Sequence, residues 1–245
     1  MLEHGIGYHT KKEKTLLKTI TDLPTFEIPY QLFLGAPQNT KMALHDNPDE
    51  VRELVQNTKA SIFVHSQYII NLCSEEAYMT DLLIQNINYA KQCGFQGVVV
   101  HVGKYVKTDP EKAVEIMRTN LLRAIEEATE ECPILLETPA GQGTETLTTC
   151  KEFVDFVKSF HDPRIRVCVD TCHVFATGYD PLSYIEYVYK RGKSLIKLIH
   201  FNDSKTECGS CVDRHEIVGE GEIGKKKMED IAVFCKGKFK MVYEG

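Results

Sequence analysis

The sequence predicts an α/β fold, a TIM (β/α)8 barrel that forms a single domain over residues 1–245. Short runs rich in β-branched residues alternate with longer segments of helical period, which is the pattern of repeated βα units around a parallel sheet. Eight such runs are present, the number that closes this kind of barrel. No linker rich in Pro, Gly or Ser divides the chain, and barrels of this length are commonly single domains.

The predicted strands are short apolar runs, and most of them end in a polar residue. GVVVH and RVCVD are typical, because β-branched residues lead directly to a histidine or an aspartate. In chain order the eight strands are expected at residues 5–9, 29–34, 61–65, 97–101, 134–137, 166–170, 197–203 and 240–244.

The clearest predicted helix lies between the fourth and fifth strands, within residues 108–130. It begins with Asp109 as N-cap and Pro110 in the first turn, and the spacing of Thr108 and Glu111 is close to a capping box. Apolar residues recur at intervals of three and four. The stripe consists of Ala113, Met117, Leu121, Ala124 and Ala128.

A second helix is predicted within residues 75–94, before the fourth strand. Leu83, Ile87 and Ala90 lie on one stripe, and Gly94 is placed to end the helix. Both segments therefore have one apolar face to pack against a sheet.

The composition is that of an ordinary folded protein, with 42% hydrophobic and 26% charged residues. No apolar run approaches the roughly 20 residues of a membrane-spanning helix. The first residues lack the basic and apolar pattern of a secretory signal. We therefore expect an intracellular protein that is not secreted and binds no membrane, with cytoplasm and nucleus both open.

The nine cysteines are sparse and unevenly spaced, which predicts reduced thiols rather than a disulfide scaffold. Cys208 and Cys211, in CGSC, could ligate zinc or exchange electrons. Two small loop residues are the favoured interpretation, because a structural zinc would need two further ligands at matching spacing. The formal net charge of −6 argues against a nucleic-acid partner, unless bound metal changes the local sign.

Metal-capable side chains stand at the ends of six consecutive predicted strands. In such barrels functional groups lie at the carboxyl ends of strands, so these side chains are expected on one rim. Asp213 and His215 are two apart in an extended segment and hence on one side of it. The candidate ligands are His65, His101, Glu137, Asp170, His173, His200, Asp213, His215 and Glu244.

A single histidine or glutamate at a strand end is usually structural, but six such residues on consecutive strands point to metal. Four carboxylates at one barrel mouth would repel one another without cations. Imidazole nitrogen mixed with carboxylate oxygen suits zinc and its transition-metal neighbours, whereas magnesium and calcium prefer oxygen alone. One zinc takes about four ligands, so nine candidates with some sharing suit two or three ions.

Several segments closely resemble the motifs of the endonuclease IV family of apurinic/apyrimidinic (AP) endonucleases. In order they are HSQYIIN, HVGK, LLETPAGQGTET, VDTCHVFATGYD, HFNDSK and VDRHEIVGEGEIG, and the resemblance runs from about residue 5 to residue 244. It implies a TIM barrel with three zinc ions, for which Mn²⁺ could substitute. On the family pattern, Glu137 bridges the first two ions. The remaining ligands would be His65 and His101 for the first zinc, Asp170, His200 and Glu244 for the second, and His173, Asp213 and His215 for the third.

The resemblance also implies an activity, namely hydrolysis of the phosphodiester bond 5′ of an abasic site in double-stranded DNA. The products would be a 3′-hydroxyl and a 5′-deoxyribose phosphate, and blocked 3′ ends could also be trimmed. Glu137 would be the catalytic residue in a monomeric repair enzyme of the deoxyribonuclease IV type. Three Zn²⁺ ions would bring the formal charge of −6 to zero.

Three residues match DNA-contacting positions of the family. Tyr68 matches a tyrosine that fills the gap at the lesion, and His9 a position near the DNA backbone. Gln38 stands where some relatives place an arginine that enters the duplex, so DNA bending or affinity is expected to differ. Relatives continue into a last helix after the residue equivalent to Glu244, whereas this sequence stops at Gly245. Either a looser Glu244 or a vacant eighth helix position is therefore expected.

Two other functions stay open from the sequence. Sugar isomerases and epimerases resemble this scaffold, but they usually rely on carboxylate-rich sites with one or two divalent ions, and five histidines argue against them. A non-catalytic DNA-lesion binder could use zinc structurally, in which case every ligand position would be closed by protein.

Overall fold

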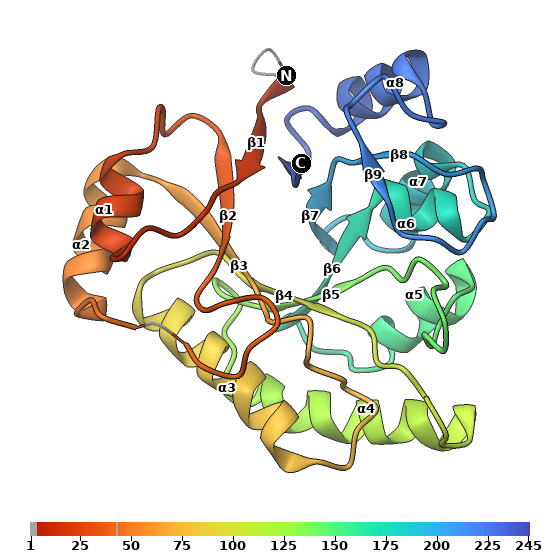
Figure 1. Cartoon of the computed structure of the whole chain (residues 1–245), viewed down its shortest axis with the longest axis horizontal. Helices are drawn as coiled ribbons and strands as arrows, with labels where there is room; N and C mark the ends of the chain where they lie inside the picture. The colour runs from red at the N-terminus through yellow and green to blue at the C-terminus, as the bar shows by residue number, and fades with distance from the viewer. Residues whose placement is uncertain (1–3, 43) are drawn as a thin grey trace.

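A computed structural model describes residues 4–42 and 44–245 and confirms the predicted TIM barrel. Eight parallel strands close in the order β1-β10-β7-β6-β5-β4-β3-β2, and the helices lie around them (Figure 1). The barrel strands are β1 (Ile6–His9), β2 (Pro29–Phe33), β3 (Ser61–His65), β4 (Val98–His101), β5 (Ile134–Glu137), β6 (Ile165–Asp170), β7 (Ile196–His200) and β10 (Lys240–Tyr243).

Eight helices connect the strands over the described residues, and two of them follow β6. They are α1 (Leu16–Thr21), α2 (Pro48–Thr58), α3 (Ala77–Gln92), α4 (Pro110–Ile125), α5 (Cys150–Lys158), α6 (Thr171–Ala176), α7 (Pro181–Arg191) and α8 (Lys225–Cys235). The last of these precedes β10, and no helix follows β10 in the part of the chain that is described. None of the helices that the structure describes combines the length and the apolar character needed to cross a bilayer.

The start of α4 agrees with the predicted cap but not with the predicted capping box. The Asp109 carboxylate accepts a hydrogen bond from the backbone N–H of Lys112 at 3.0 Å, and Pro110 is the first helical residue. Because the N-cap is Asp109 and not Thr108, Glu111 is the second helical residue, one position before the third helical position that a capping box requires. The predicted stripe is buried against the barrel, and so is the stripe of α3, which ends just before Gly94 at φ +74°.

The inside of the barrel is filled by one apolar residue from each of six strands. These residues are Phe63, Val99, Leu135, Cys168, Leu198 and Val242. Because successive strand side chains alternate between two faces, the residue two positions further on also points to the barrel axis. Those next residues are His65, His101, Glu137, Asp170, His200 and Glu244. The six candidate ligands therefore lie next to this apolar layer, on the side of the carboxyl ends of the strands.

The predicted strand at 197–203 is wrong in one respect, because the segment contains two strands. The chain leaves the barrel after His200, where β7 ends, and residues Asp203–Ser204 form β8. This short strand pairs antiparallel with β9 (His215–Glu216) outside the barrel. The break arises at Asn202, because its backbone bonds to a side chain rather than to a neighbouring strand. Its N–H donates to Thr171 Oγ1 at 2.9 Å, and its carbonyl lies 2.6 Å from the same hydroxyl.

The loop that follows β9 is anchored by Asp203. Its buried carboxylate accepts backbone N–H groups from Gly219 at 2.9 Å, Ile223 at 3.0 Å and Gly221 at 3.2 Å. Gly221 passes so close to β8 that a Cβ atom would lie 2.4 Å from the Ser204 carbonyl oxygen. Only glycine fits there, and the close approach fixes the ribbon that presents His215.

Candidate metal centre

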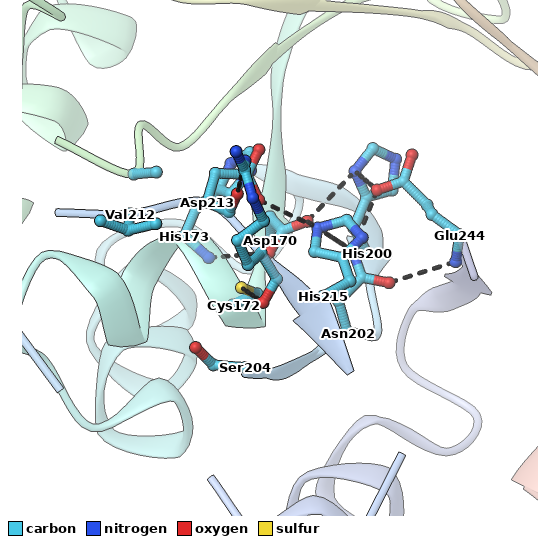
Figure 2. Close-up of polar contacts among 12 residues, drawn as sticks. Asp170, Cys172, His173, His200, Asn202, Ser204, Val212, Asp213, His215 and Glu244 are labelled. Carbon is cyan, nitrogen blue, oxygen red and sulfur yellow. Dashed lines mark hydrogen bonds and ion pairs between the residues drawn. The ribbon is translucent and has the colours of Figure 1, made fainter. Parts of the chain in front are cut away.

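All nine predicted ligands converge at the carboxyl ends of the barrel strands. Figure 2 shows six of them gathered around one another, from β6, α6, β7, the 211–216 segment and the end of β10. A pocket of about 390 Å³ opens onto this rim. The ligand atoms form three groups of three or four, each with its atoms within 4.8 Å of one another.

The first group consists of His65, His101 and Glu137. One oxygen of Glu137, Oε2, lies 3.0 Å from His101 Nε2 and 3.3 Å from His65 Nε2. His65 and Glu137 are buried, and His101 is partly exposed toward the pocket.

The second group shares Glu137 and adds Asp170, His200 and Glu244. The other oxygen of Glu137, Oε1, lies 2.8 Å from His200 Nδ1. The same nitrogen is 3.2 Å from Glu244 Oε2 and 3.7 Å from Asp170 Oδ2. Because its two oxygens face different histidines, Glu137 is placed to bridge the first and second groups.

The third group consists of His173, Asp213 and His215. Asp213 Oδ2 lies 3.2 Å from His173 Nε2, and Asp213 Oδ1 lies 3.3 Å from His215 Nε2. The latter oxygen is buried without a hydrogen-bond partner among the described residues, as expected of an atom that ligates a cation. Asp170 Oδ2, 3.8 Å from His215 Nε2, connects this group to the second.

Two of the imidazoles are oriented by a hydrogen bond at Nδ1, the nitrogen opposite the one that lies against the carboxylate of their own group. His65 Nδ1 lies 2.7 Å from the Ser66 carbonyl, and His173 Nδ1 lies 2.8 Å from the Thr138 carbonyl. A carbonyl can only accept, so each of these nitrogens donates and the opposite nitrogen keeps its lone pair. Such contacts fix the tautomer of metal-binding histidines. The donor set therefore fits zinc or a related transition metal.

Two residues that the sequence reasoning missed hold the second group in place. Gln31 Nε2 donates to Glu244 Oε1 at 2.8 Å, while Gln31 Oε1 lies 2.8 Å from His200 Nε2. Asn202 Nδ2 donates to Asp170 Oδ2 at 2.6 Å and to Glu244 Oε2 at 2.9 Å. A polar residue in the middle of the apolar run PYQLFL was the available signal for Gln31. Glu244 is thus held firmly, contrary to the expected loosening.

Burial and charge act against each other at the carboxylates. Burial raises the pKa of Asp170 above its usual range. Burial also opposes the ionised forms of Glu137 and Glu244, but the surrounding histidines outweigh it and hold both pKa values below the usual range. Burial also opposes the ionised form of Asp213, but the adjacent His173 and His215 imidazoles outweigh it and lower the pKa of this carboxyl.

At the imidazoles the neighbouring carboxylates decide the direction in most cases. Burial opposes the charged form of His215, but its bond to Asp213 raises the pKa to about 8. The pKa values of His173 and His200 are also raised, because nearby anionic groups outweigh burial. At His65 burial prevails and lowers the pKa. The metal-free centre therefore holds protons that a cation would have to displace.

The three predicted DNA-contacting residues lie at different distances from the centre. Tyr68 is 52% exposed and lines the same pocket, with its ring centroid 5.2 Å from that of His65 and 5.5 Å from that of His101. His9 borders the second group, where its Nδ1 lies 3.1 Å from Gln31 Nε2. Gln38 is exposed in the turn after β2 and does not line this pocket.

The cysteines are free thiols, and Cys208 and Cys211 are exposed in the loop between β8 and β9. Neither belongs to a group of potential metal ligands among the described residues. Cys172, in contrast, is buried, and its sulfur lies close enough to ligand atoms of Asp170 and His215 for these three residues to hold one cation together. Burial raises the pKa of this thiol to about 12, so it is protonated in the metal-free protein.

Together these features define a TIM-barrel protein with a candidate metal centre at the carboxyl ends of its strands. Comparison with known proteins narrows this class. A family described as xylose isomerase-like TIM barrel matches residues 25–232. A protein of Mycoplasma mobile described as "Probable endonuclease 4" is 33% identical over 219 residues, which cover 84% of this chain and 77% of the relative. The chain belongs to the endonuclease IV family.

Solved structures agree on the fold. Endonuclease IV from Thermus thermophilus superimposes with a TM-score of 0.82 at 24% identity, covering 98% of this chain and 91% of that one. A D-tagatose 3-epimerase-like protein gives a TM-score of 0.72 at 17% identity, with 98% and 90% covered. At these identities the likeness concerns the barrel alone.

Proposed function

We propose that the protein is a metal-dependent DNA repair endonuclease that hydrolyses the phosphodiester bond 5′ of abasic sites in double-stranded DNA. The observation that carries the proposal is the convergence of five imidazoles and four carboxylates on one barrel rim. Its relatives at about one-third identity are described as endonucleases, which supports the same activity. The proposal includes 3′-hydroxyl and 5′-deoxyribose phosphate products, trimming of blocked 3′ ends, and a monomeric intracellular enzyme.

The ligand chemistry fits three zinc ions, with Mn²⁺ as a substitute. Imidazole nitrogen together with carboxylate oxygen is a common donor set of zinc. Three dipositive ions would cancel the formal charge of −6 and make the rim attractive to phosphate. The three sets of ligands would be His65, His101 and Glu137; Glu137, Asp170, His200 and Glu244; and His173, Asp213 and His215.

Bound ions would supply an activated water molecule and neutralise charge on the phosphoryl and leaving oxygens. The chain's own residues hold and orient the parts. Glu137 would keep two cations at a fixed separation through its two oxygens, which is the catalytic role we assign to it. An abasic nucleotide has no base to unstack, so it leaves the duplex at a low cost in free energy. Tyr68 would pack into the gap that the missing base leaves. His9 and Gln38 would contact DNA outside the pocket.

The same geometry argues against the two alternatives. The first and third groups contain three protein ligands each, so a cation of about four ligands keeps a position for water or substrate. An open position favours catalysis over a purely structural ion. The likeness to a sugar epimerase extends to the barrel, whereas five histidines distinguish this rim from a carboxylate-rich sugar site.

Metal analysis of the purified protein, combined with cleavage of a synthetic abasic duplex, tests the proposal. We expect about three bound zinc ions, a 3′-hydroxyl at the nick, and loss of cleavage with a chelator that is restored by Zn²⁺ or Mn²⁺. A glucose or xylulose isomerisation assay serves as the comparison. Tight binding of the abasic duplex without turnover, at full metal occupancy, would instead support a lesion-binding protein.

A further inference from the structure

The loop after β4, residues 102–109, presents an unusual valine beside the metal centre. Val106 has φ +50°, which is rare for any residue with a side chain and a clear outlier for a β-branched one. It is also 61% exposed and lines the same pocket as His101 and Glu137. A strained side chain that the fold leaves uncovered is a candidate for contact with a ligand.

The strain is imposed by bonds to the loop after β5. The Tyr105 N–H donates to the Thr144 carbonyl at 2.9 Å, and the Val106 N–H donates to Thr144 Oγ1 at 3.1 Å. The Thr146 N–H in turn donates to the Gly103 carbonyl at 3.0 Å. The Thr108 N–H donates to the Tyr105 carbonyl at 2.7 Å, so the backbone is held on both sides of Val106 and the loop is preformed.

Lys104 gives the same loop a positive charge. Among the described residues that line the pocket, it is the one lysine or arginine. Its backbone is held by Asn71, which accepts from the Lys104 N–H at 2.8 Å and donates to its carbonyl at 3.0 Å. The ammonium lies 3.5 Å from Glu145, whose side chain is 8% exposed and also accepts the N–H of Gln142 at 3.0 Å. A buried carboxylate thus holds the cation at the pocket wall.

We propose that this loop is a preformed contact for the nucleotide next to the cleaved bond, with Lys104 binding its phosphate and Val106 packing on its sugar or base. A nucleotide presents an anionic group beside an apolar face, and the loop presents a cation and an apolar side chain two residues apart. The inference rests on the proposed function, because it names how the same pocket grips its substrate.

The phosphate contact is tested through the salt dependence of binding. The ligand is a nicked abasic duplex, the product of the proposed reaction, and the protein is metal-loaded. The logarithm of the binding constant falls linearly with the logarithm of the salt concentration, with a slope of about −0.9 for each phosphate contact. Loss of one contact therefore makes this slope shallower by about 0.9. Lys104→Gln should show that loss. Lys190→Gln is the control, because Lys190 is also ion-paired but lies in the last turn of α7, away from the rim. Equal slopes for the two variants would overturn the role of Lys104.

The apolar contact is tested with two substitutions of Val106. Val106→Ala should raise KM and Kd about 10-fold, the usual effect of lost apolar contact in a site. Val106→Asn should weaken binding as much while raising Tm by about 2–4 °C, because asparagine tolerates the left-handed region. Val233→Ala, at an equally exposed valine on α8, is the control. Wild-type binding by both Val106 variants would refute this contact.

Failure of this inference and failure of the proposed function give different results. If the wild-type protein cleaves abasic duplex and the loop variants match their controls, only the loop contact is wrong. If the wild-type protein binds the nicked duplex without any cleavage activity, and the loop variants still weaken binding, the loop contact stands and the endonuclease proposal fails.

Discussion

His200 illustrates how one hydrogen bond decides what an imidazole can do. Its Nε2 lies 2.8 Å from Gln31 Oε1, which leaves Nδ1 facing Glu137 and Glu244. The sequence shows that this histidine ends a strand, but not which nitrogen faces the carboxylates. That choice belongs to Gln31, which is 169 residues away along the chain.

Glu137→Ala should abolish turnover, because a carboxylate shared by the first and second ligand groups is removed. We expect a loss of cleavage of about 10³-fold or more, on the scale of deleting a catalytic group, together with reduced metal content. Initial rates and atomic absorption measure the two effects. Glu186→Ala, on the outer surface of α7, is the control. An unchanged cleavage rate for Glu137→Ala would contradict the assignment.

Tyr68→Ala should weaken lesion engagement more than it slows the chemical step. Stacking of a base on an aromatic ring contributes about 1–3 kcal/mol, so KM should rise about 10-fold or more while kcat changes little. Tyr78→Ala is a matched control, because Tyr78 has similar exposure, 49%, but lies on α3. Similar KM values for the two variants would show that Tyr68 is an ordinary surface aromatic.

At the scale of elements, strand periodicity is what assembles the centre. Six strands each place an apolar residue inside the barrel and a ligand two residues later. The remaining three ligands are positioned by elements outside the barrel strands. His173 stands on α6, whose N-cap is the Asp170 carboxylate, accepting the His173 N–H at 2.8 Å. Asp213 and His215 lie in the segment that leads into β9, which pairs with β8 and is followed by the loop that Asp203 anchors.

Asp203→Asn should destabilise the protein and loosen the third ligand group. A buried carboxylate that accepts several N–H groups loses about 2–3 kcal/mol or more when one oxygen becomes a donor. Urea unfolding measures the free energy, and metal analysis should show fewer bound ions. Asp230→Asn, on the exposed side of α8, is the control. Identical unfolding midpoints for the two variants would exclude an anchoring role.

At the scale of the whole molecule, a net charge of −6 opposes the proposed binding of a polyanion, and bound metal would reverse the sign locally at the rim. Without metal, His173, His200 and His215, whose pKa values are raised, pair with carboxylates of the same centre. Cations must displace the protons of these imidazoles, because ligands bind metal in the deprotonated form. Stability and metal affinity should therefore respond to pH in opposite directions.

The metal-free protein should lose stability as pH rises from about 6.5 through 8. The pKa of His215 is raised to about 8, so its pairing stabilises fully below the ordinary value of 6.5 and is lost above about 8. The lowered pKa values of Glu137 and Glu244 act at the other end, where stability falls as pH drops below 4.5. Zinc affinity should instead increase across 6.5 to 8.

Unfolding midpoints with and without chelator, and zinc titrations across this range, check both trends. The raised pKa of Asp170 and the lowered pKa of His65 oppose them, so the expected slopes are shallow rather than steep. A metal-free protein that becomes more stable from pH 6.5 to 9 would contradict the ion pairing seen at the centre.

The sequence alone determined the barrel, its strands to within a residue or so at most ends, and the identity of all nine candidate ligands. It could do so because strand periodicity, helix caps and strand-end residues are local patterns. The motifs also identified the family that the comparisons confirm. Local patterns failed at 197–203, where the Asn202 backbone bonds to the Thr171 hydroxyl and the ladder ends.

Only the tertiary structure decided how the ligands are grouped and what supports them. Glu137 lies between the first and second ligand groups because β4 and β7 bring His101 and His200 to its two different oxygens. Gln31 matters because barrel closure brings β2 near the end of β10. These are contacts between residues far apart in the chain, and no local pattern encodes them. Their geometry depends on how eight strands are staggered when the sheet closes.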